Sequence, residues 1–308
     1  MSGPLVAISA RIIAGLAPIA TQAGFETKLA WELPDEDRAR VRVLLHAGEW
    51  VLAPDYLATF PSLGLIAVVS AGYEGVDVAW CRAHGIEVTA ADGVNADDVA
   101  DHAMGLLLAG SRDMHEHDRA IREGRWRLED RLAPQPSLTG RKLGIVGLGH
   151  IGAAIARRAE ACRLQVSWWG PRAKVAPWPM APSLLALAEE SDILVLACPG
   201  GEATRRIVGR EVIDAVGPEG MIVNVARGSV VDEDALIDAL KAGRLRRAAL
   251  DVFEQEPTPA DRWADVPGVF MTPHRAGGTT EGIPNMMAKA LANVRAFLAG
   301  EPVISPVA

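Results

Sequence analysis

The sequence predicts an α/β protein with two doubly wound parallel-sheet domains and a cleft between them. Short apolar segments alternate with helical segments along most of the chain, which is typical of parallel sheets flanked by helices. A glycine-rich turn lies near the middle of the sequence, at residues 147–152, so the chain before it is long enough for another domain. With 308 residues in all, each of the two domains can have a hydrophobic core of its own.

The first part of the chain is expected to form most of one domain. Its predicted strands are the apolar segments at residues 5–8, 41–45, 65–70 and 85–89. A short helical stretch is expected over residues 56–60. Near the end of the chain, residues 283–298 carry apolar side chains at helical spacing, which predicts a helix with one buried face. We expect residues 1–96 and 279–308 together to form a discontinuous, flavodoxin-like substrate-binding domain.

The remaining residues, 97–278, are expected to form the second domain. A long helix is predicted over residues 97–112, where apolar side chains recur at helical spacing. A polar segment that ends with residues 133–140 follows and is interpreted as a loop. Six further apolar strands are predicted, at residues 143–146, 164–169, 193–197, 221–225, 248–250 and 269–271. Six strands suit a complete Rossmann-like nucleotide-binding sheet.

The glycine-rich turn is the dinucleotide-binding fingerprint Gly-x-Gly-x-x-Gly in its required context, between an apolar strand and an alanine-rich helix over residues 153–161. Gly147 permits the tight turn, Gly149 lets the backbone approach a pyrophosphate, and Gly152 lets the helix pack closely on the strand. The N-terminus of the helix then offers N–H groups to the phosphates. The alternative is a glycine-rich turn without a ligand.

The end of the following strand indicates which nucleotide binds. NAD sites usually have an acidic residue about 20 residues beyond the glycines, which binds the ribose 2′-hydroxyl. Here no acid lies between Gln165 and Lys174, and the segment carries Arg172 and Lys174 instead. These two cations favour the 2′-phosphate of NADP(H). Their structural alternative is a pair of solvated surface cations.

Three later segments carry polar side chains in apolar surroundings, at residues 224–229, 249–257 and 271–278. Each follows the end of a predicted strand. An open α/β sheet has its ligand crevice at the carboxyl ends of its strands, so these segments are candidates for the functional site.

The combination of motifs resembles the D-isomer-specific 2-hydroxyacid dehydrogenases over essentially the whole chain. The motifs are the fingerprint, Val-Ala-Arg-Gly at 225–228, Asp-Val-Phe-x-x-Glu-Pro at 251–257 and Thr-Pro-His at 272–274, in that order. Within this family, Arg172 and the Ala-Cys-Pro segment at 197–199 are most similar to NADPH-dependent glyoxylate, hydroxypyruvate and hydroxyphenylpyruvate reductases. The resemblance implies NADPH-dependent reduction of a small 2-oxo acid to the D-2-hydroxy acid by hydride transfer.

The resemblance also implies roles for particular residues. Arg227 would bind the substrate carboxylate and polarise the 2-oxo group. His274 would donate a proton to the ketone oxygen as the hydride arrives. Glu256 would pair with His274, orient its ring and raise its pKa. The backbone of Ala71 and Gly72 would hold the substrate carboxylate from the first domain.

The expected cofactor contacts come from the fingerprint and from the strand ends. They are Gly147, Gly149, His150, Ile151, Gly152, Arg172, Lys174, Cys198, Pro199, Thr204, Val225, Ala226, Asp251 and Gly277. Among them, Asp251 would face the nicotinamide ring and its amide. No metal site is expected, because the three cysteines are scattered and form no metal-binding pattern.

Each role has a structural alternative. Arg227 could be a surface arginine, and Glu256 a solvated loop carboxylate. His274 could be a turn histidine, and Asp251 could cap a turn. Arg275 departs from the family pattern, in which an apolar residue is usual; it could lower the pKa of the neighbouring histidine or favour a more acidic substrate.

Other functions remain open at this point. Hydroxyphenylpyruvate reductase or another 2-hydroxyacid dehydrogenase is an alternative among enzymes, but formate dehydrogenases of the family carry glutamine where this chain has Glu256. A non-catalytic NAD(H)-binding corepressor or sensor is an alternative from another class. The joint presence of Arg227, Glu256 and His274 favours an enzyme.

Composition and termini indicate the partners. A net charge of −8 argues against nucleic acid or an anionic membrane as a partner. We expect a cytoplasmic protein, because the N-terminus has no signal-peptide pattern and the sequence has no run of apolar residues long enough to span a membrane. The resemblance implies a homodimer, for which residues 119–136, with Trp126 and Leu132, are the candidate segment.

Substrate choice is expected to depend on side chains of the first domain. The candidates are His46, Trp50 and Tyr73.

Overall fold

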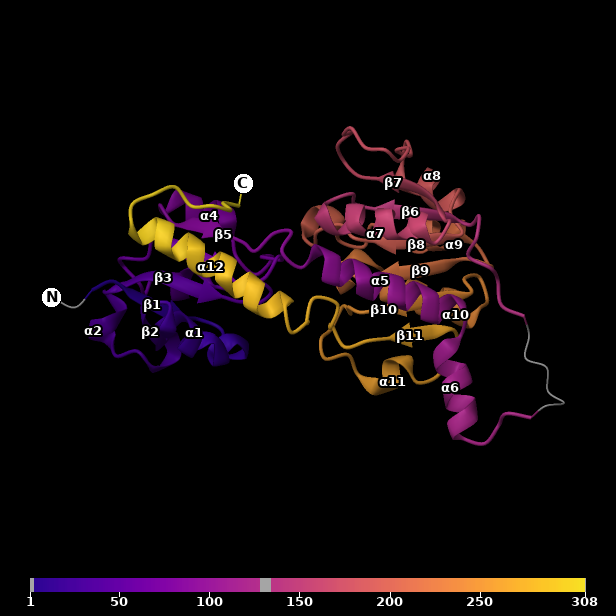
Figure 1. The fold of residues 1–308 in the computed structure, drawn as a ribbon, viewed down its shortest axis with the longest axis horizontal. Helices are drawn as coiled ribbons and strands as arrows, with labels where there is room; N and C mark the ends of the chain where they lie inside the picture. The colour runs from indigo at the N-terminus through magenta and orange to yellow at the C-terminus, as the bar shows by residue number, and fades with distance from the viewer. Residues whose placement is uncertain (1–2, 128–133, 308) are drawn as a thin grey trace. The chain divides into compact units, whose positions relative to one another are not determined.

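The structure is a computed structural model that describes residues 3–127 and 134–307. It divides into two compact units, which Figure 1 shows: residues up to Asn95 together with those from Thr280 onward, and Ala96–Thr279. Leu132, one of the residues named for the dimer segment, lies outside the described residues.

The first unit is built on a five-stranded parallel sheet with the order β2-β1-β3-β4-β5. Its strands are β1 (Leu5–Ile8), β2 (Glu26–Leu29), β3 (Val41–His46), β4 (Leu65–Val68) and β5 (Glu87–Thr89). This is the strand order of flavodoxin-like sheets. The sequence did not predict β2, because this edge strand alternates exposed and half-buried residues and has no apolar run.

Helices cover both faces of this sheet. They are η1 (Arg11–Leu16), α1 (Ala17–Gln22), η2 (Ala30–Glu32), α2 (Asp35–Arg38), α3 (Pro54–Leu57), α4 (Val78–Ala83) and α12 (Gly282–Leu298). The helix predicted over residues 56–60 begins earlier, since Pro54 at its first position is already set for helical geometry. The last helix, α12 (yellow in Figure 1), packs Met287, Leu291 and Val294 on apolar side chains of β1, β3 and β4.

The second unit is built on a six-stranded parallel sheet with the order β11-β10-β9-β8-β6-β7. Its strands are β6 (Lys142–Val146), β7 (Gln165–Trp169), β8 (Ile193–Leu196), β9 (Met221–Asn224), β10 (Arg247–Leu250) and β11 (Val269–Met271). The chain turns from one side of β6 to the other between β7 and β8. Ligands of open α/β sheets bind at such a switch point, beyond the carboxyl ends of the strands.

All the helices of the second unit except α6 lie on or beside the two faces of its sheet, which carry two apolar clusters. The helices of this unit are α5 (Ala96–Ser111), α6 (Met114–Arg122), α7 (His150–Ala161), α8 (Leu184–Glu189), η3 (Glu202–Thr204), α9 (Arg210–Val216), η4 (Gly228–Val230), α10 (Glu233–Lys241) and α11 (Ala260–Trp263). Among the described residues, none of the helices of either unit has the length and apolar character needed to cross a membrane.

Helix α6 is a correction to the sequence analysis, which interpreted the polar segment after the long helix as a loop. Asp113 adopts a left-handed backbone conformation, with φ of 49°, and thereby separates α6 from α5. Its carboxylate is buried and accepts a hydrogen bond of 2.6 Å from Nε of Arg247. Helix α6 itself is polar and is stabilised by ion pairs such as Asp118–Arg122, at 2.8 Å. A helix of only nine residues, most of them polar, gives a weak periodic signal in the sequence.

Candidate active site

The glycine-rich turn connects β6 to α7 and has space for a ligand. Gly147 has φ of 92°, and a Cβ atom there would lie 2.7 Å from the Cα of Cys198. A Cβ atom on Gly152 would lie 2.1 Å from the carbonyl oxygen of Gly147, so α7 packs directly on the turn. At Gly149, in contrast, a Cβ atom would meet no other atom within 4 Å. The open side of the turn therefore faces away from the protein at the N-terminus of α7, where N–H groups can bind a pyrophosphate.

The segment after β8 forms the neighbouring wall of this turn. Cys198 is buried, and burial raises the pKa of its thiol to about 11, so the side chain is neutral. Thr204 donates its hydroxyl to the carbonyl oxygen of Pro199, at 2.8 Å. This wall is therefore uncharged at Cys198, and the loop that forms it is stabilised by the hydrogen bond between Thr204 and Pro199.

The end of β7 carries only positive charge among its ionisable side chains. Arg172 and Lys174 are both exposed, and Nζ of Lys174 lies 5.6 Å from the centre of the Trp168 ring. The position at which NAD-binding proteins usually have an acid is therefore occupied by a cationic loop.

The loop after β9 is fixed by a buried asparagine that the sequence analysis did not single out. The side-chain oxygen of Asn224 accepts the N–H of Ala226 at 3.0 Å, and its amide nitrogen donates to the carbonyl oxygen of Arg227 at 3.1 Å. These contacts hold Val225 and Ala226 in place after β9 and position the half-buried Arg227 at the carboxyl end of the sheet. The available signal was the asparagine itself, since such a residue at the start of a turn often bonds the backbone two residues later.

A glycine contact joins this loop to the turn that carries Glu256. A Cβ atom on Gly228 would lie 1.8 Å from the carbonyl carbon of Phe253 and 2.2 Å from the nitrogen of Glu254. The backbone next to Arg227 therefore lies directly against the 253–256 turn.

Glu256 and His274 form a hydrogen-bonded pair. Nδ1 of His274 lies 2.7 Å from Oε2 of Glu256, and Oε1 of Glu256 accepts the N–H of Phe253 at 2.9 Å. Burial alone would raise the pKa of the Glu256 carboxyl. The hydrogen bonds from His274 and Phe253, together with the positive charges of His274 and Arg227, lower this pKa by more than burial raises it, so the net shift is downward. Glu256 is therefore ionised at neutral pH and suited to hold a protonated imidazole.

Asp251 holds the loop on which His274 lies. Its buried carboxylate accepts hydrogen bonds from the Thr272 hydroxyl at 2.5 Å, from the N–H of Arg275 at 2.9 Å and from the N–H of Ala276 at 2.8 Å. His274 itself has φ of 50°, a left-handed conformation that costs about 1 kcal/mol or more for a residue with a side chain. The contacts of Asp251 stabilise this conformation.

His102, on α5, belongs to the same network. Its Nε2 atom lies 2.9 Å from Oγ1 of Thr272 and 3.3 Å from Oδ1 of Asp251. His102 was not among the predicted site residues, and 170 positions separate it from Thr272 in the sequence. The other predicted contacts lie in the same loops or in the first turn of α7: His150, Ile151 and Gly277.

The remaining predicted residues belong to the first unit. Ala71 and Gly72 follow β4, and among the described residues no acceptor faces their N–H groups. The Ser70 hydroxyl fixes this loop by donating to the carbonyl oxygen of Gly72 at 2.9 Å. Trp50 and Tyr73 are exposed.

His46 does not have the exposed position expected of a substrate-selecting side chain. It is buried, with Nδ1 2.9 Å from Oγ of Ser9 and Nε2 2.8 Å from the carbonyl oxygen of Trp50. Burial lowers its pKa more than the hydrogen bond to Trp50 raises it, so the ring is neutral. His46 therefore connects β3 to neighbouring loops. Within residues 3–127 and 134–307, no group of three or more His, Cys, Asp and Glu side chains is placed to hold a metal ion.

A doubly wound sheet with an open glycine turn at a helix N-terminus defines a dinucleotide-binding protein. Residues 104–276 match the family model of the D-isomer specific 2-hydroxyacid dehydrogenase, NAD binding domain. The chain belongs to the D-isomer-specific 2-hydroxyacid dehydrogenases, which confirms the resemblance seen in the sequence, and the predicted pair of parallel-sheet α/β domains is confirmed as well.

Individual relatives are reductases of 2-oxo acids. Glyoxylate/hydroxypyruvate reductase A of Arabidopsis thaliana is 40% identical over 252 residues, which are 82% of this chain and 80% of that protein. Hydroxyphenylpyruvate reductase of Plectranthus scutellarioides is 39% identical over 254 residues, 82% of this chain and 81% of that protein. The crystal structure of an NADPH-dependent glyoxylate/hydroxypyruvate reductase from Sinorhizobium meliloti, in complex with NADP and malonate, is 34% identical and covers 100% of this chain and 97% of its own, with a TM-score of 0.92. These similarities support an oxidoreductase that uses NAD(P).

Proposed function

We propose that the protein reduces a small 2-oxo acid of the glyoxylate or hydroxypyruvate type to the D-2-hydroxy acid, with NADPH as the reductant and His274 as the proton donor. The observation that carries this proposal is the Glu256–His274 hydrogen bond of 2.7 Å in the dinucleotide-binding unit, on a turn that touches the backbone beside Arg227. An ionised carboxylate bound to Nδ1 favours the protonated ring and directs its other nitrogen, Nε2, to the substrate.

Each residue then has a defined task. The guanidinium of Arg227 binds the substrate carboxylate and polarises the carbonyl. His274 donates a proton from Nε2 to the ketone oxygen, and Glu256 stabilises the charged ring before that transfer. The N–H groups of Ala71 and Gly72, in the first unit, bind the substrate carboxylate. NADPH, when bound, supplies the hydride.

The chain's own residues also support the choice of cofactor. The open side of Gly149 and the N-terminus of α7 would hold the pyrophosphate. The side chains of Arg172 and Lys174 would bind the 2′-phosphate, which a carboxylate at that position would repel. The relative from S. meliloti is an NADPH-dependent reductase that was crystallised with NADP, which is consistent with this assignment.

The proposal is tested by the absorbance of NADPH at 340 nm with glyoxylate, hydroxypyruvate and 4-hydroxyphenylpyruvate as separate substrates. We expect turnover with at least glyoxylate or hydroxypyruvate, and its loss by orders of magnitude in His274→Ala with little change in NADPH affinity. A preference for 4-hydroxyphenylpyruvate would assign the activity of the relative from P. scutellarioides instead. Tight NADPH binding without turnover of any 2-oxo acid would favour the non-catalytic sensor.

We further propose that the protein is a homodimer joined through α6 and the segment after it. Met114, Ile121 and Trp126 are exposed apolar side chains in this otherwise charged region. Light scattering after size exclusion should give about twice the chain mass of 32.7 kDa for the wild type and one chain mass for the double variant Ile121→Glu, Trp126→Glu. Ile12→Glu, at another exposed apolar position, is the control. A monomeric wild type would contradict the proposal.

A further inference from the structure

We propose that Glu233 is a positioning residue for the Glu256–His274 pair, because its buried carboxylate binds the backbone of the 253–256 turn. The inference rests on the proposed function, in which this pair delivers the proton. Glu233 is the first residue of α10 and lies in neither of the motifs that contain the proposed catalytic groups.

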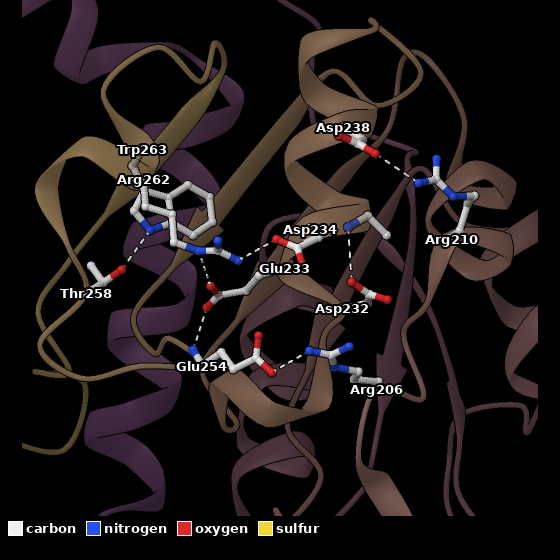
Figure 2. A network of polar contacts seen from close by, with 11 residues as sticks. Arg206, Arg210, Asp232, Glu233, Asp234, Asp238, Glu254, Thr258, Arg262 and Trp263 are labelled. Carbon is white, nitrogen blue, oxygen red and sulfur yellow. Dashed lines mark hydrogen bonds and ion pairs between the residues drawn. The ribbon is translucent and has the colours of Figure 1, made fainter.

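Both oxygens of Glu233 are used inside the protein. Oε1 accepts the backbone N–H of Glu254 at 2.5 Å, and Oε2 accepts Nε–H of Arg262 at 2.9 Å. Figure 2 shows the carboxylate between these two partners. The side chain of Glu233 is only 4% exposed. A buried carboxylate is costly unless it is paired and hydrogen-bonded, so this arrangement leaves the side chain little freedom to move.

The atom that Glu233 binds lies inside the turn that carries Glu256. The N–H of Phe253, one peptide before, donates to Oε1 of Glu256 at 2.9 Å and so holds the carboxylate that binds His274. A shift of the Glu254 backbone therefore moves the hydrogen-bond donor of Glu256 with it. The distance between Glu256 and His274 therefore depends on Glu233, whose side chain is hydrogen-bonded to Glu254 and Arg262 instead.

A second anchor comes from α11, which also supplies the partner of Glu233. Trp263 packs edge-on against Phe253, with ring centres 5.9 Å apart, and its indole N–H donates to the Thr258 hydroxyl at 3.0 Å. Arg262 and Trp263 are neighbours in the chain. Glu233, through its ion pair with Arg262 and its hydrogen bond to Glu254, thus fixes the position of α11 relative to the 253–256 turn.

The other ion pairs around the turn are not equivalent to this one. Arg206 binds the side chain of Glu254 at 2.7 Å, but that pair is exposed and leaves the backbone of the turn untouched. Asp234 also binds Arg262, at 3.0 Å, yet its side chain is 74% exposed and does not contact the turn. Asp234 is therefore a matched control: it shares the partner of Glu233 and the helix terminus, but not the contact that the proposal requires.

The first test measures the Glu256–His274 pair without turnover. The imidazole of His274 is titrated by NMR in the cofactor-free protein, its signal being identified by its loss in His274→Asn. Glu256→Gln should move the midpoint down by about one pH unit or more, because the ring loses its anionic partner. Glu233→Gln should move it in the same direction by a smaller, measurable amount, since glutamine cannot accept from both Glu254 and Arg262.

Asp234→Asn should leave this midpoint at the wild-type value. A wild-type midpoint in Glu233→Gln would overturn the proposal. If Glu233→Gln fails to fold, Arg262→Lys replaces it, because lysine lacks the planar fork that binds two carboxylates and leaves Glu233 less firmly held. A wild-type midpoint in folded Arg262→Lys would then overturn the proposal in the same way.

The second test is kinetic. Glu233→Gln should lower kcat roughly tenfold or more with little change in NADPH affinity, whereas Asp234→Asn should retain wild-type kcat. A variant with a lower melting temperature but unchanged kcat and unchanged His274 titration would assign Glu233 a structural role alone and refute positioning. If the wild type turns over no 2-oxo acid, the proposed function fails, and the titration still decides whether Glu233 controls the pair.

Discussion

Replacing Gly228 with alanine tests whether activity requires a fixed position of Arg227 relative to the Glu256–His274 pair. The added Cβ atom would lie 1.8 Å from the carbonyl carbon of Phe253, and that neighbour is backbone, which cannot rotate away as a side chain can. Ordinary carbon–carbon contact begins at about 3.5 Å, so the 253–256 turn and the loop of Arg227 must separate by roughly 1.7 Å.

That displacement sets the expected magnitude. A misplacement of about 1 Å between groups that act together can cost about a hundredfold in rate. We therefore expect kcat/KM for the 2-oxo acid to fall about a hundredfold in Gly228→Ala, equivalent to about 2.7 kcal/mol of transition-state stabilisation. Overpacking should also lower the free energy of unfolding by about 1–3 kcal/mol.

The assay follows NADPH oxidation at a temperature well below the melting temperature of the variant, so that loss of folded protein does not contribute. Gly105→Ala is the matched control, because Gly105 is an exposed residue within α5 whose Cβ atom would meet nothing within 4 Å. It should keep full activity and gain about 0.5–1 kcal/mol of stability. Full kcat/KM in Gly228→Ala would refute the reasoning, since the turn would then tolerate the displacement.

Three further predictions concern the charges of the site. The partners of Glu256 hold its pKa below the usual value, so the stability that these contacts give is present at neutral pH and is lost as the pH falls through this lowered pKa. In Glu256→Gln, the alkaline limb of the pH profile of kcat/KM for reduction should move to lower pH by about one unit, and an unmoved limb would show that Glu256 does not control the protonation of His274. The double variant Arg172→Ala, Lys174→Ala should raise KM for NADPH about tenfold or more and leave KM for NADH nearly unchanged, whereas equal changes for both cofactors would contradict a 2′-phosphate site. Asp251→Asn replaces a carboxylate oxygen with an N–H donor that faces a backbone N–H donor. The free energy of unfolding, measured by thermal unfolding, should therefore fall by about 1–3 kcal/mol, and an unchanged melting temperature would contradict these hydrogen bonds.

Most of the fold could be predicted because buried parallel strands have a simple sequence signal. Strands such as β8 and β9 are apolar at every position or nearly so, since helices cover both of their faces. β2 and α6 give no such signal. The strand lies at a sheet edge. The helix is short and mostly polar, and it depends on the contact of Asp113 with Arg247, which are far apart in sequence.

The candidate site divides in a similar way. The glycine turn could be predicted from the spacing of its glycines between an apolar strand and an alanine-rich helix, because each glycine meets a local steric requirement. The roles of Arg227, Glu256 and His274 came from the family resemblance, since no local rule relates residues on three different loops. Glu233 was missed because an acid in the first turn of a helix is usually an exposed partner of the helix dipole, and its burial depends on the packing of α11.

The position of α12 in the chain has a consequence for biosynthesis. Its buried face covers apolar side chains of β1, β3 and β4, although more than 200 residues separate it from each of these strands in sequence. The second unit, in contrast, is contiguous from Ala96 to Thr279. During translation, the apolar surface that α12 covers in the finished protein therefore stays exposed while the whole of the other unit emerges from the ribosome. Chaperones that bind exposed apolar strands would have access to the nascent chain at this surface.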